Sequence, residues 1–207
     1  DYFGNTIPQE EKNSRSSFFL RYIATTAAFG HAASLPDANE WGLPSTVKAY
    51  FMLQKIQERY LNSSVSRVRY HQNGHFTSLN DALHSGAYEQ GQLQIDYENK
   101  TRIYANLGTT SWEIEEADQT FLLPPGSFWA SADEGRIIAY SNETEDGRID
   151  YASCDDYLYI DTHGRSVDHG PISLNGAALV KERKWEIDVI PMDCNMPTVI
   201  DVGNLWP

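Results

Sequence analysis

The spacing of apolar residues changes once along the chain, near residues 60–65. Before this point apolar side chains recur every three or four residues, which is the spacing of an amphipathic helix. It predicts a helix over residues 15–29 that ends at Gly30, and a second helix that runs from Ser45, its N-terminal cap, to about Tyr60. The buried face of the first helix is expected to consist of Phe18, Phe19, Tyr22, Ile23, Thr26 and Ala27.

From Val65 onward apolar and polar residues alternate, which is the pattern of a strand with one buried face. Turn-forming residues separate the alternating runs, as at Asn73-Gly74 and at Glu98-Asn99-Lys100. Residues 79–88 fit either a short helix or an ordered loop. Eight or more short strands predict an antiparallel β-sandwich. The expected fold is therefore mainly β, and α+β overall: an antiparallel β-sandwich preceded by two α-helices.

This change of pattern divides the chain into a helical segment, residues 1–62, and an antiparallel β-sandwich domain, residues 63–207. Two helices cannot bury their own apolar faces in isolation, because each has one apolar stripe that needs a partner surface. The helices are therefore expected to pack on the β part, on a second copy of the chain, or on a part of the protein that is missing here.

Charge is distributed unevenly over the 207 residues, whose formal net charge is −13. Residues 1–70 contain eight basic and six acidic residues (+2), and residues 71–207 contain eight basic and twenty-three acidic residues (−15). The acidic part should repel nucleic acid and anionic membranes, so we expect neither as a partner. Cys154 and Cys194 match no metal or redox motif, and they could form one disulfide or remain two buried thiols.

Four aspartates are candidate ligands for a metal ion. Asp155 and Asp156, with Asp150 and Asp161 nearby, could supply carboxylate oxygens to Ca²⁺. Their spacing is not that of an EF-hand, and aspartate is also common in turns. Apart from this possible Ca²⁺ we expect no cofactor, because the six histidines lack the spacing of a zinc site and the chain contains no phosphate-binding glycine loop.

Short motifs are spread over residues 20–192, and they include Phe29-Gly30-His31-Ala32-Ala33, Tyr50-Phe51-Met52-Leu53-Gln54, Ile95-Asp96-Tyr97-Glu98-Asn99, Leu122-Leu123-Pro124-Pro125-Gly126 and Leu158-Tyr159-Ile160-Asp161. In order and spacing, this series resembles the C-terminal part of large bacterial glycoside-hydrolase-like proteins. In those proteins a (β/α)₈ barrel precedes an antiparallel β domain. The resemblance implies that residues 1–62 are the last helices of a barrel, which needs about 200 or more residues and whose earlier strands, with the catalytic carboxylates, lie outside this chain.

The loop between the two helices contains the chemical groups with which proteins bind sugars. Its aromatic residue can stack on the C–H groups of a sugar ring, and its carboxylates and amide can hold hydroxyl groups. In the resemblance this loop lies on the rim of the active-site cleft. The alternative is a packed helix–helix connection in which the tryptophan covers the core. The candidate substrate-binding residues are His31, Asp37, Asn39, Glu40 and Trp41.

Glycoside hydrolysis needs two carboxyl groups about 5–10 Å apart. Asp37 with Glu40 is one candidate pair, and Glu113, Glu115 and Glu116 form a second acidic group. Strand alternation is expected to place Glu113 and Glu115 together on an exposed face. Neither set has a supporting motif, so the catalytic residues are not identified and the chain alone is expected to be inactive.

The sequence therefore predicts the C-terminal portion of a secreted or periplasmic carbohydrate-active enzyme, a glycoside hydrolase, in which the β domain is structural or shapes the substrate site. One alternative is a non-catalytic carbohydrate-binding module that uses aromatic residues such as Trp129 on a sandwich face, although aromatic residues are also common in sandwich cores. The other is an assembly protein whose helices pack on a partner. The expected partners are a carbohydrate, the rest of a parent polypeptide, or a second copy.

Overall fold

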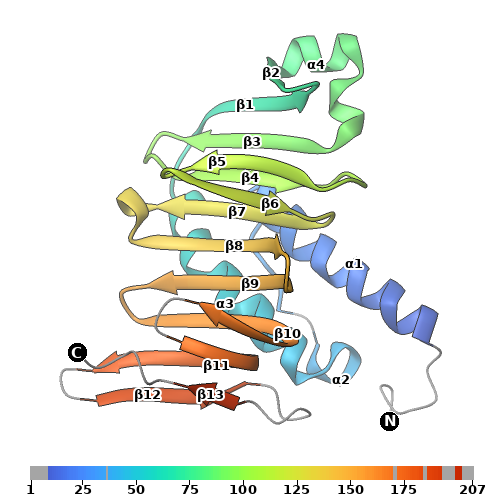
Figure 1. Cartoon of the computed structure of the whole chain (residues 1–207). Coiled ribbons are helices and arrows are strands. Elements are labelled where there is room, and N and C mark those ends of the chain that lie inside the picture. Colours follow the sequence, from blue (N-terminus) through green and yellow to red (C-terminus); the bar gives the residue numbers. More distant parts are fainter. Residues whose placement is uncertain (1–8, 36, 170–171, 184–185, 193–198, 202–207) are drawn as a thin grey trace.

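A computed structural model describes residues 9–35, 37–169, 172–183, 186–192 and 199–201. Within these ranges one antiparallel sheet of eleven strands forms the middle layer (Figure 1). Neighbouring strands are mostly consecutive in sequence, in the order β12-β11-β10-β9-β8-β7-β4-β3-β1-β2, and β13 pairs with β11. The strands of this sheet are β1 (Val65–Gln72), β2 (His75–Ser78), β3 (Gln92–Tyr97), β4 (Arg102–Asn106), β7 (Ser127–Ala132), β8 (Ile137–Thr144), β9 (Gly147–Cys154), β10 (Tyr157–His169), β11 (Ile172–Arg183), β12 (Glu186–Pro191) and β13 (Val199–Asp201).

Two long helices, α1 (Gln9–Ala28) and α3 (Leu43–Tyr60), lie across one face of this sheet (Figure 1). They share one hydrophobic core with it, so the β part covers their inner faces. Of the three surfaces on which the helices were expected to pack, the structure therefore shows the first, the β part of the same chain. The buried residues of this core include Phe19, Ile23 and Ala27 of α1, Met52, Leu53 and Ile56 of α3, and Ile95, Ile103, Phe128 and Tyr159 of the sheet.

The helix boundaries differ from the sequence prediction. The first helix begins at Gln9, and the second begins at Leu43 with Gly42 as its N-cap, so the prediction of Ser45 as the cap is wrong. Pro44 lies in the first turn of α3, where the missing N–H of proline costs no hydrogen bond. A single turn of helix, α2 (Ala38–Trp41), also forms inside the predicted loop.

Helix α1 ends close to the predicted residue. Gly30 adopts a left-handed conformation with φ of +63°, which favours glycine, and a Cβ atom there would lie 2.9 Å from the Tyr97 hydroxyl oxygen. The buried face of α1 is narrower than predicted, because Phe18 is 63% exposed. No helix in the described ranges combines the length and apolar character needed to cross a bilayer.

The opposite face of the sheet is covered in part by a separate hairpin, β5 (Trp112–Glu116) and β6 (Gln119–Leu123) (Figure 1). Aromatic residues of the hairpin and the sheet fill the space between them. Trp112 and Trp129 are both 4% exposed, so these two side chains belong to a core and cannot stack on a ligand. The cluster consists of Tyr104, Trp112, Ile114, Phe121, Leu123, Trp129 and Tyr140.

Strand β10 bends at a bulge between Asp161 and Ser166. Beyond the bend, Val167 of β10 and Leu174 of β11 pack with Ile160 and its neighbours in a third apolar cluster. The hairpin and this bent region add a small second layer to the large sheet. The fold is thus mainly antiparallel β with preceding helices, a sandwich-like α+β arrangement, as the sequence predicted.

The remaining short elements lie between β2 and β3 and between β7 and β8. Residues 79–88 form α4 (Leu79–Ser85) and the start of the 3₁₀ turn η1 (Ala87–Gln90), and the turn η2 (Asp133–Gly135) connects β7 to β8. Asn73-Gly74 is the turn between β1 and β2, as predicted.

Candidate functional site

The predicted loop site is built around α2. The Asp37 carboxylate accepts hydrogen bonds from the backbone N–H of Asn39 at 2.8 Å and from its side-chain amide at 3.1 Å, so it serves as the N-cap of this turn. His31 and Glu40 are exposed, and Trp41 is half-buried. The loop therefore holds these polar groups on the surface, while Trp41 and Ala33 pack against the core.

Trp41 stacks on Phe18 of α1, with ring centroids 5.8 Å apart and an interplanar angle of 16°. Together with Tyr22, Ser34 and Leu35, these rings line an apolar cleft of about 250 Å³. The hydroxyl of Tyr22 donates to the carbonyl of Ser34 and closes one side of the cleft. Of the five residues predicted to bind substrate, only the tryptophan lines this cleft.

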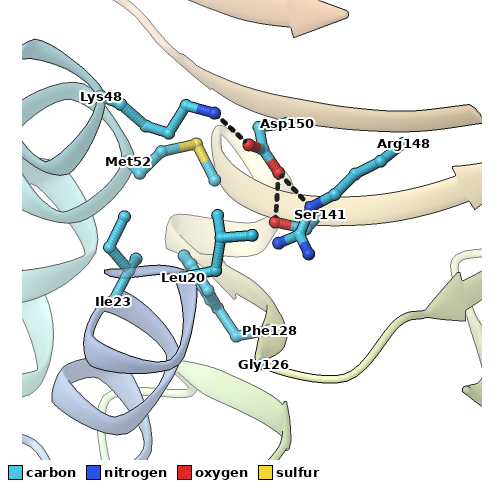
Figure 2. A pocket seen from close by; sticks show the side chains of 9 residues that line it. All are labelled: Leu20, Ile23, Lys48, Met52, Gly126, Phe128, Ser141, Arg148 and Asp150. Atoms are coloured by element: carbon cyan, nitrogen blue, oxygen red, sulfur yellow. Dashed lines mark hydrogen bonds and ion pairs between the residues drawn. The ribbon is translucent and has the colours of Figure 1, made fainter. Parts of the chain in front are cut away.

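A buried charged cluster lies between α3 and the sheet, and sequence reasoning did not predict it. The Lys48 ammonium is 2.6 Å from Asp150 Oδ2 and 2.6 Å from Asp161 Oδ2 (Figure 2 shows the first contact). The Asp150 side chain is 1% exposed and the Lys48 side chain 11%. This lysine is on the inner, otherwise apolar face of α3, one turn before Met52.

The register of the sheet assembles the acceptors of this cluster. Ser141 of β8 pairs with Asp150 of β9, which in turn pairs with Asp161 of β10. Residues that are directly opposite each other on adjacent strands project from the same face. All three side chains therefore project towards α3 in one row across three strands.

The bulge in β10 brings a histidine back to the same row. His163 has φ of +53° and is followed by Gly164 with φ of +77°, a pair of left-handed residues that turns the strand. The backbone N–H of His163 donates to Asp161 Oδ1 at 2.8 Å. As a result, its ring Nε2 lies 2.9 Å from Asp150 Oδ2.

Both oxygens of Asp150 have two partners each. Oδ1 accepts from the Ser141 hydroxyl at 2.5 Å and from Arg148 Nε at 3.1 Å (Figure 2). Oδ2 faces the Lys48 ammonium and the His163 ring. A buried carboxylate with this many partners satisfies the rule that charges leave water only when they are paired and hydrogen-bonded.

Burial alone would raise the pKa of Asp150, since it disfavours the charged form. The opposing charges of Lys48, Arg148 and His163 outweigh burial and hold the pKa of Asp150 well below its usual range. Burial would likewise lower the pKa of Lys48, but Asp150 and Asp161 raise it above its usual value. Both partners are therefore charged at neutral pH.

The cluster has the donor atoms of a metal site, because ligand atoms of Asp150, Asp161 and His163 all lie within 4.8 Å of one another. The Lys48 ammonium, however, contacts both carboxylates where a cation would bridge them. The adjoining cavity has a volume of about 10 Å³, which is room for about one water molecule. The arrangement therefore suits an internal clamp between helix and sheet better than a site for a substrate.

The four aspartates named as possible calcium ligands are divided between two places. Asp155 and Asp156 occupy the turn between β9 and β10, where they pair with Arg136 and with a lysine of α3. Asp150 lies five residues before Asp155, and Asp161 lies five residues after Asp156, a separation of roughly 16 Å at the rise of a strand. The register thus separates the two pairs.

The second acidic group is also divided. Glu113 and Glu115 are exposed on the same face of β5, as predicted. Glu116 instead accepts hydrogen bonds from Arg102 at 2.9 Å and from the Tyr104 hydroxyl at 2.6 Å. These carboxylates therefore differ in environment, and no cleft with two facing carboxyl groups is formed around them by the described residues.

Of the two cysteines, Cys154 is a half-buried free thiol at the end of β9. It accepts a hydrogen bond from the backbone N–H of Asp156 at 3.4 Å. Cys194 lies outside the described residues.

Two signals in the sequence could have indicated the charged cluster. Lys48 interrupts the apolar stripe of α3, and Asp150 occupies an alternating position that faces the same way as Ala152. A charged residue at a core position usually has a partner of opposite charge. The sequence does not show that these two residues are partners, because Asp150 is 102 positions after Lys48.

Comparison of the chain with protein-family models, with curated proteins and with solved structures finds no match in any of the three.

Proposed function

We propose that this chain is the C-terminal portion of a carbohydrate-active enzyme, a glycoside hydrolase, whose β part has a structural or substrate-shaping role. The observation that carries this proposal is the outer surface of the helical layer. The inner face of the helical layer is buried on the sheet. Large apolar residues of this layer are nevertheless exposed: Phe18 by 63%, Phe29 by 54% and Leu43 by 58%. Large apolar side chains on both sides of a helix layer are expected where a further layer, such as the rest of a barrel, covers the outside.

The catalytic carboxylates are placed outside the chain in this proposal. A glycosidase pair must flank a cleft that admits a sugar. The buried Asp150 and the half-buried Asp161 face each other, but they share the Lys48 ammonium and adjoin a cavity of about 10 Å³. That volume supports a structural role for the pair.

Polysaccharide substrates lie outside the cytoplasm, so the proposal includes a secreted or periplasmic location. Carbohydrate is the proposed substrate class, and the rest of the parent polypeptide is the proposed partner of the outer helical surface. The loop of His31, Asp37, Asn39, Glu40 and Trp41 is proposed to lie at the rim of the substrate cleft.

The proposal is tested by assaying the purified chain against a panel of aryl glycosides and polysaccharides. We expect no turnover, because the acid and the nucleophile are elsewhere. Turnover by this chain that is abolished by Glu40→Ala would overturn the proposal. The second test is the coding sequence upstream of Asp1, which should encode a barrel of about 200 or more residues with alternating strands and helices.

A non-catalytic carbohydrate-binding module is the second candidate function. The observation in its favour is a polar cleft at one end of the sheet, lined by amide, hydroxyl and guanidinium groups. The two candidates differ in the upstream sequence, since a binding module does not require a barrel.

A further inference from the structure

A polar cleft lies where β3 begins and β4 ends, beside α1. Its volume is about 430 Å³, within the range of small-molecule sites. It shares no lining residue with the charged cluster or with the apolar cleft at Trp41. The side chains that line it are Arg21 of α1, Glu89 and Gln90 of η1, Gln92 of β3, and Thr109 and Thr110 of the β4–β5 connection.

The backbone around this cleft is closely packed and held in place. A Cβ atom on Gly108 would lie 2.2 Å from the carbonyl oxygen of Gln90, so the two walls approach as only glycine allows. Leu107 donates its N–H to the carbonyl of Gly91 at 2.7 Å. The fully buried Asn106 donates its amide to the carbonyl of Thr110 at 2.8 Å. A site that is ordered before binding loses less conformational entropy when a ligand arrives.

Several polar groups in this cleft are available to a ligand. Within the described part of the chain, the side chains of Arg21, Gln90, Thr109 and Thr110 make no hydrogen bond or ion pair. Gln92 is oriented by His71, whose Nδ1 lies 2.9 Å from the amide oxygen, which leaves the amide NH₂ group as a donor. The cleft therefore offers amides, hydroxyls and a guanidinium group side by side.

The charges select the class of ligand. Arg21 and Glu89 lie in the same cleft and give it no net charge, and the β part as a whole is strongly acidic. A simple anion or cation is attracted by one of these side chains and repelled by the other, so neither is favoured overall. A neutral ligand with many hydroxyl groups can donate to Glu89 and accept from Arg21. The exposed ring of Tyr88, whose hydroxyl donates to Glu89 at 3.3 Å, adds an aromatic surface beside the cleft.

From these observations we infer that the cleft between η1 and the β4–β5 connection binds a neutral saccharide. Arg21, Gln90 and Gln92 hold its hydroxyl groups, and Tyr88 contacts one face of its ring. The inference rests on the second candidate function, which uses the same cleft. It is independent of the first, since a structural β part need not bind sugar itself.

The test is saturation-transfer NMR on the purified chain with glucose, galactose, mannose, N-acetylglucosamine, maltose, cellobiose and lactose, and with glucuronic acid and glucosamine as charged probes. We expect at least one neutral sugar to bind and the charged analogues to bind more weakly. The variants Arg21→Ala and Gln90→Ala should each weaken binding by about tenfold, because each removes a hydrogen bond to the sugar. Both residues are exposed on the surface or at the cleft edge, so the variants should fold normally.

Two control variants separate the possible outcomes. Arg136→Ala removes an exposed arginine that pairs with Asp155 elsewhere, and it should leave binding unchanged. Trp41→Ala removes a stacked ring of the apolar cleft and tests whether a sugar binds there instead. If no neutral sugar binds, or if binding is lost with Trp41→Ala but kept with Arg21→Ala, the inference is wrong. Neither result contradicts the proposal of a glycoside-hydrolase fragment, which is overturned instead by turnover that depends on Glu40 or by an upstream sequence without a barrel. The absence of sugar binding would, however, remove the support for the carbohydrate-binding module.

Discussion

At the scale of single residues, the buried Asp150 is the clearest case of a side chain whose chemistry is set by its surroundings. It is almost inaccessible to water, yet its two oxygens contact four polar groups. The resulting shift in its pKa links protonation to folding, because protonated Asp150 would lose its ion pair with Lys48.

This linkage predicts how stability depends on pH. The pKa of Asp150 is lower in the folded protein than in the unfolded chain, where the pKa of an aspartate is about 3.9. Its contribution to stability is therefore present above that value and is lost as the pH falls through the lower pKa of the folded state. We expect the free energy of unfolding to fall steeply below about pH 4, and to fall less steeply in Asp150→Asn. Urea denaturation at a series of pH values measures both slopes.

The exposed Asp146 provides the matched control for this measurement. Asp146→Asn should keep the acid dependence of the wild-type chain. Equal slopes in the wild type and in Asp150→Asn would contradict the role given to the buried carboxylate.

At the scale of elements, the Lys48 contacts join helix α3 to strands β9 and β10. The helix also packs on the sheet through apolar side chains, which bind without a preferred register, and it forms ion pairs nearer the surface through Lys55 and Arg59. A buried ion pair contributes less net stability than its short distances suggest, because both groups lose their hydration. We expect its main effect to be the choice of one position of α3 over the sheet.

The element-scale prediction concerns the loss of this lysine. Lys48→Met leaves the buried Asp150 and the half-buried Asp161 with too few partners, and it should lower the free energy of unfolding by about 3–5 kcal/mol. Chemical denaturation followed by circular dichroism gives this value. Lys55→Met is the control, since Lys55 is on the same helix but pairs with a carboxylate at the surface, and its loss should change stability little. A Lys48→Met variant as stable as the wild type would show that the clamp is not needed.

The loop between α1 and α3 shows that residue types alone do not identify a binding site. Asp37 and Asn39 have the residue types of a sugar site, but in the structure they cap a single helical turn. Aspartate and asparagine serve both purposes, because the same oxygen that binds a hydroxyl can accept from a backbone N–H. Residue type alone therefore cannot distinguish a cap from a binding group.

At the scale of the whole molecule, the helices and the sheet share one core, while the outer side of the helical layer retains apolar residues. Phe18 belongs to α1, and Phe29 directly follows the last residue of this helix. Such a surface tends to associate when nothing covers it.

This surface leads to a prediction about the chain in solution. The chain alone should self-associate as its concentration rises, and Phe18→Ser combined with Phe29→Ser should weaken that association. Analytical ultracentrifugation over a range of concentrations measures it. Leu83→Ser changes an equally exposed residue on α4 and should have no effect. A wild-type chain that stays monomeric at every concentration would contradict the need for a covering layer.

The sequence by itself determined the local structure of this protein. The change from helical to alternating spacing near residue 65 located the boundary between α3 and β1, and Asn73-Gly74 marked a turn. These features depend on neighbours within a few residues, where backbone geometry and turn preferences act directly. The N-cap of α3 was misplaced by three residues, because Ser45 and Gly42 are both acceptable caps and only the packed structure selects one.

The tertiary structure alone decided which distant side chains meet. Lys48 reaches Asp150 across 102 residues, and Arg21 joins a cleft whose other walls come from η1 and the β4–β5 connection. Such contacts depend on the register of each strand pair and on the position of the helices over the sheet. Both are selected by burial of the whole core, which no local stretch of sequence encodes.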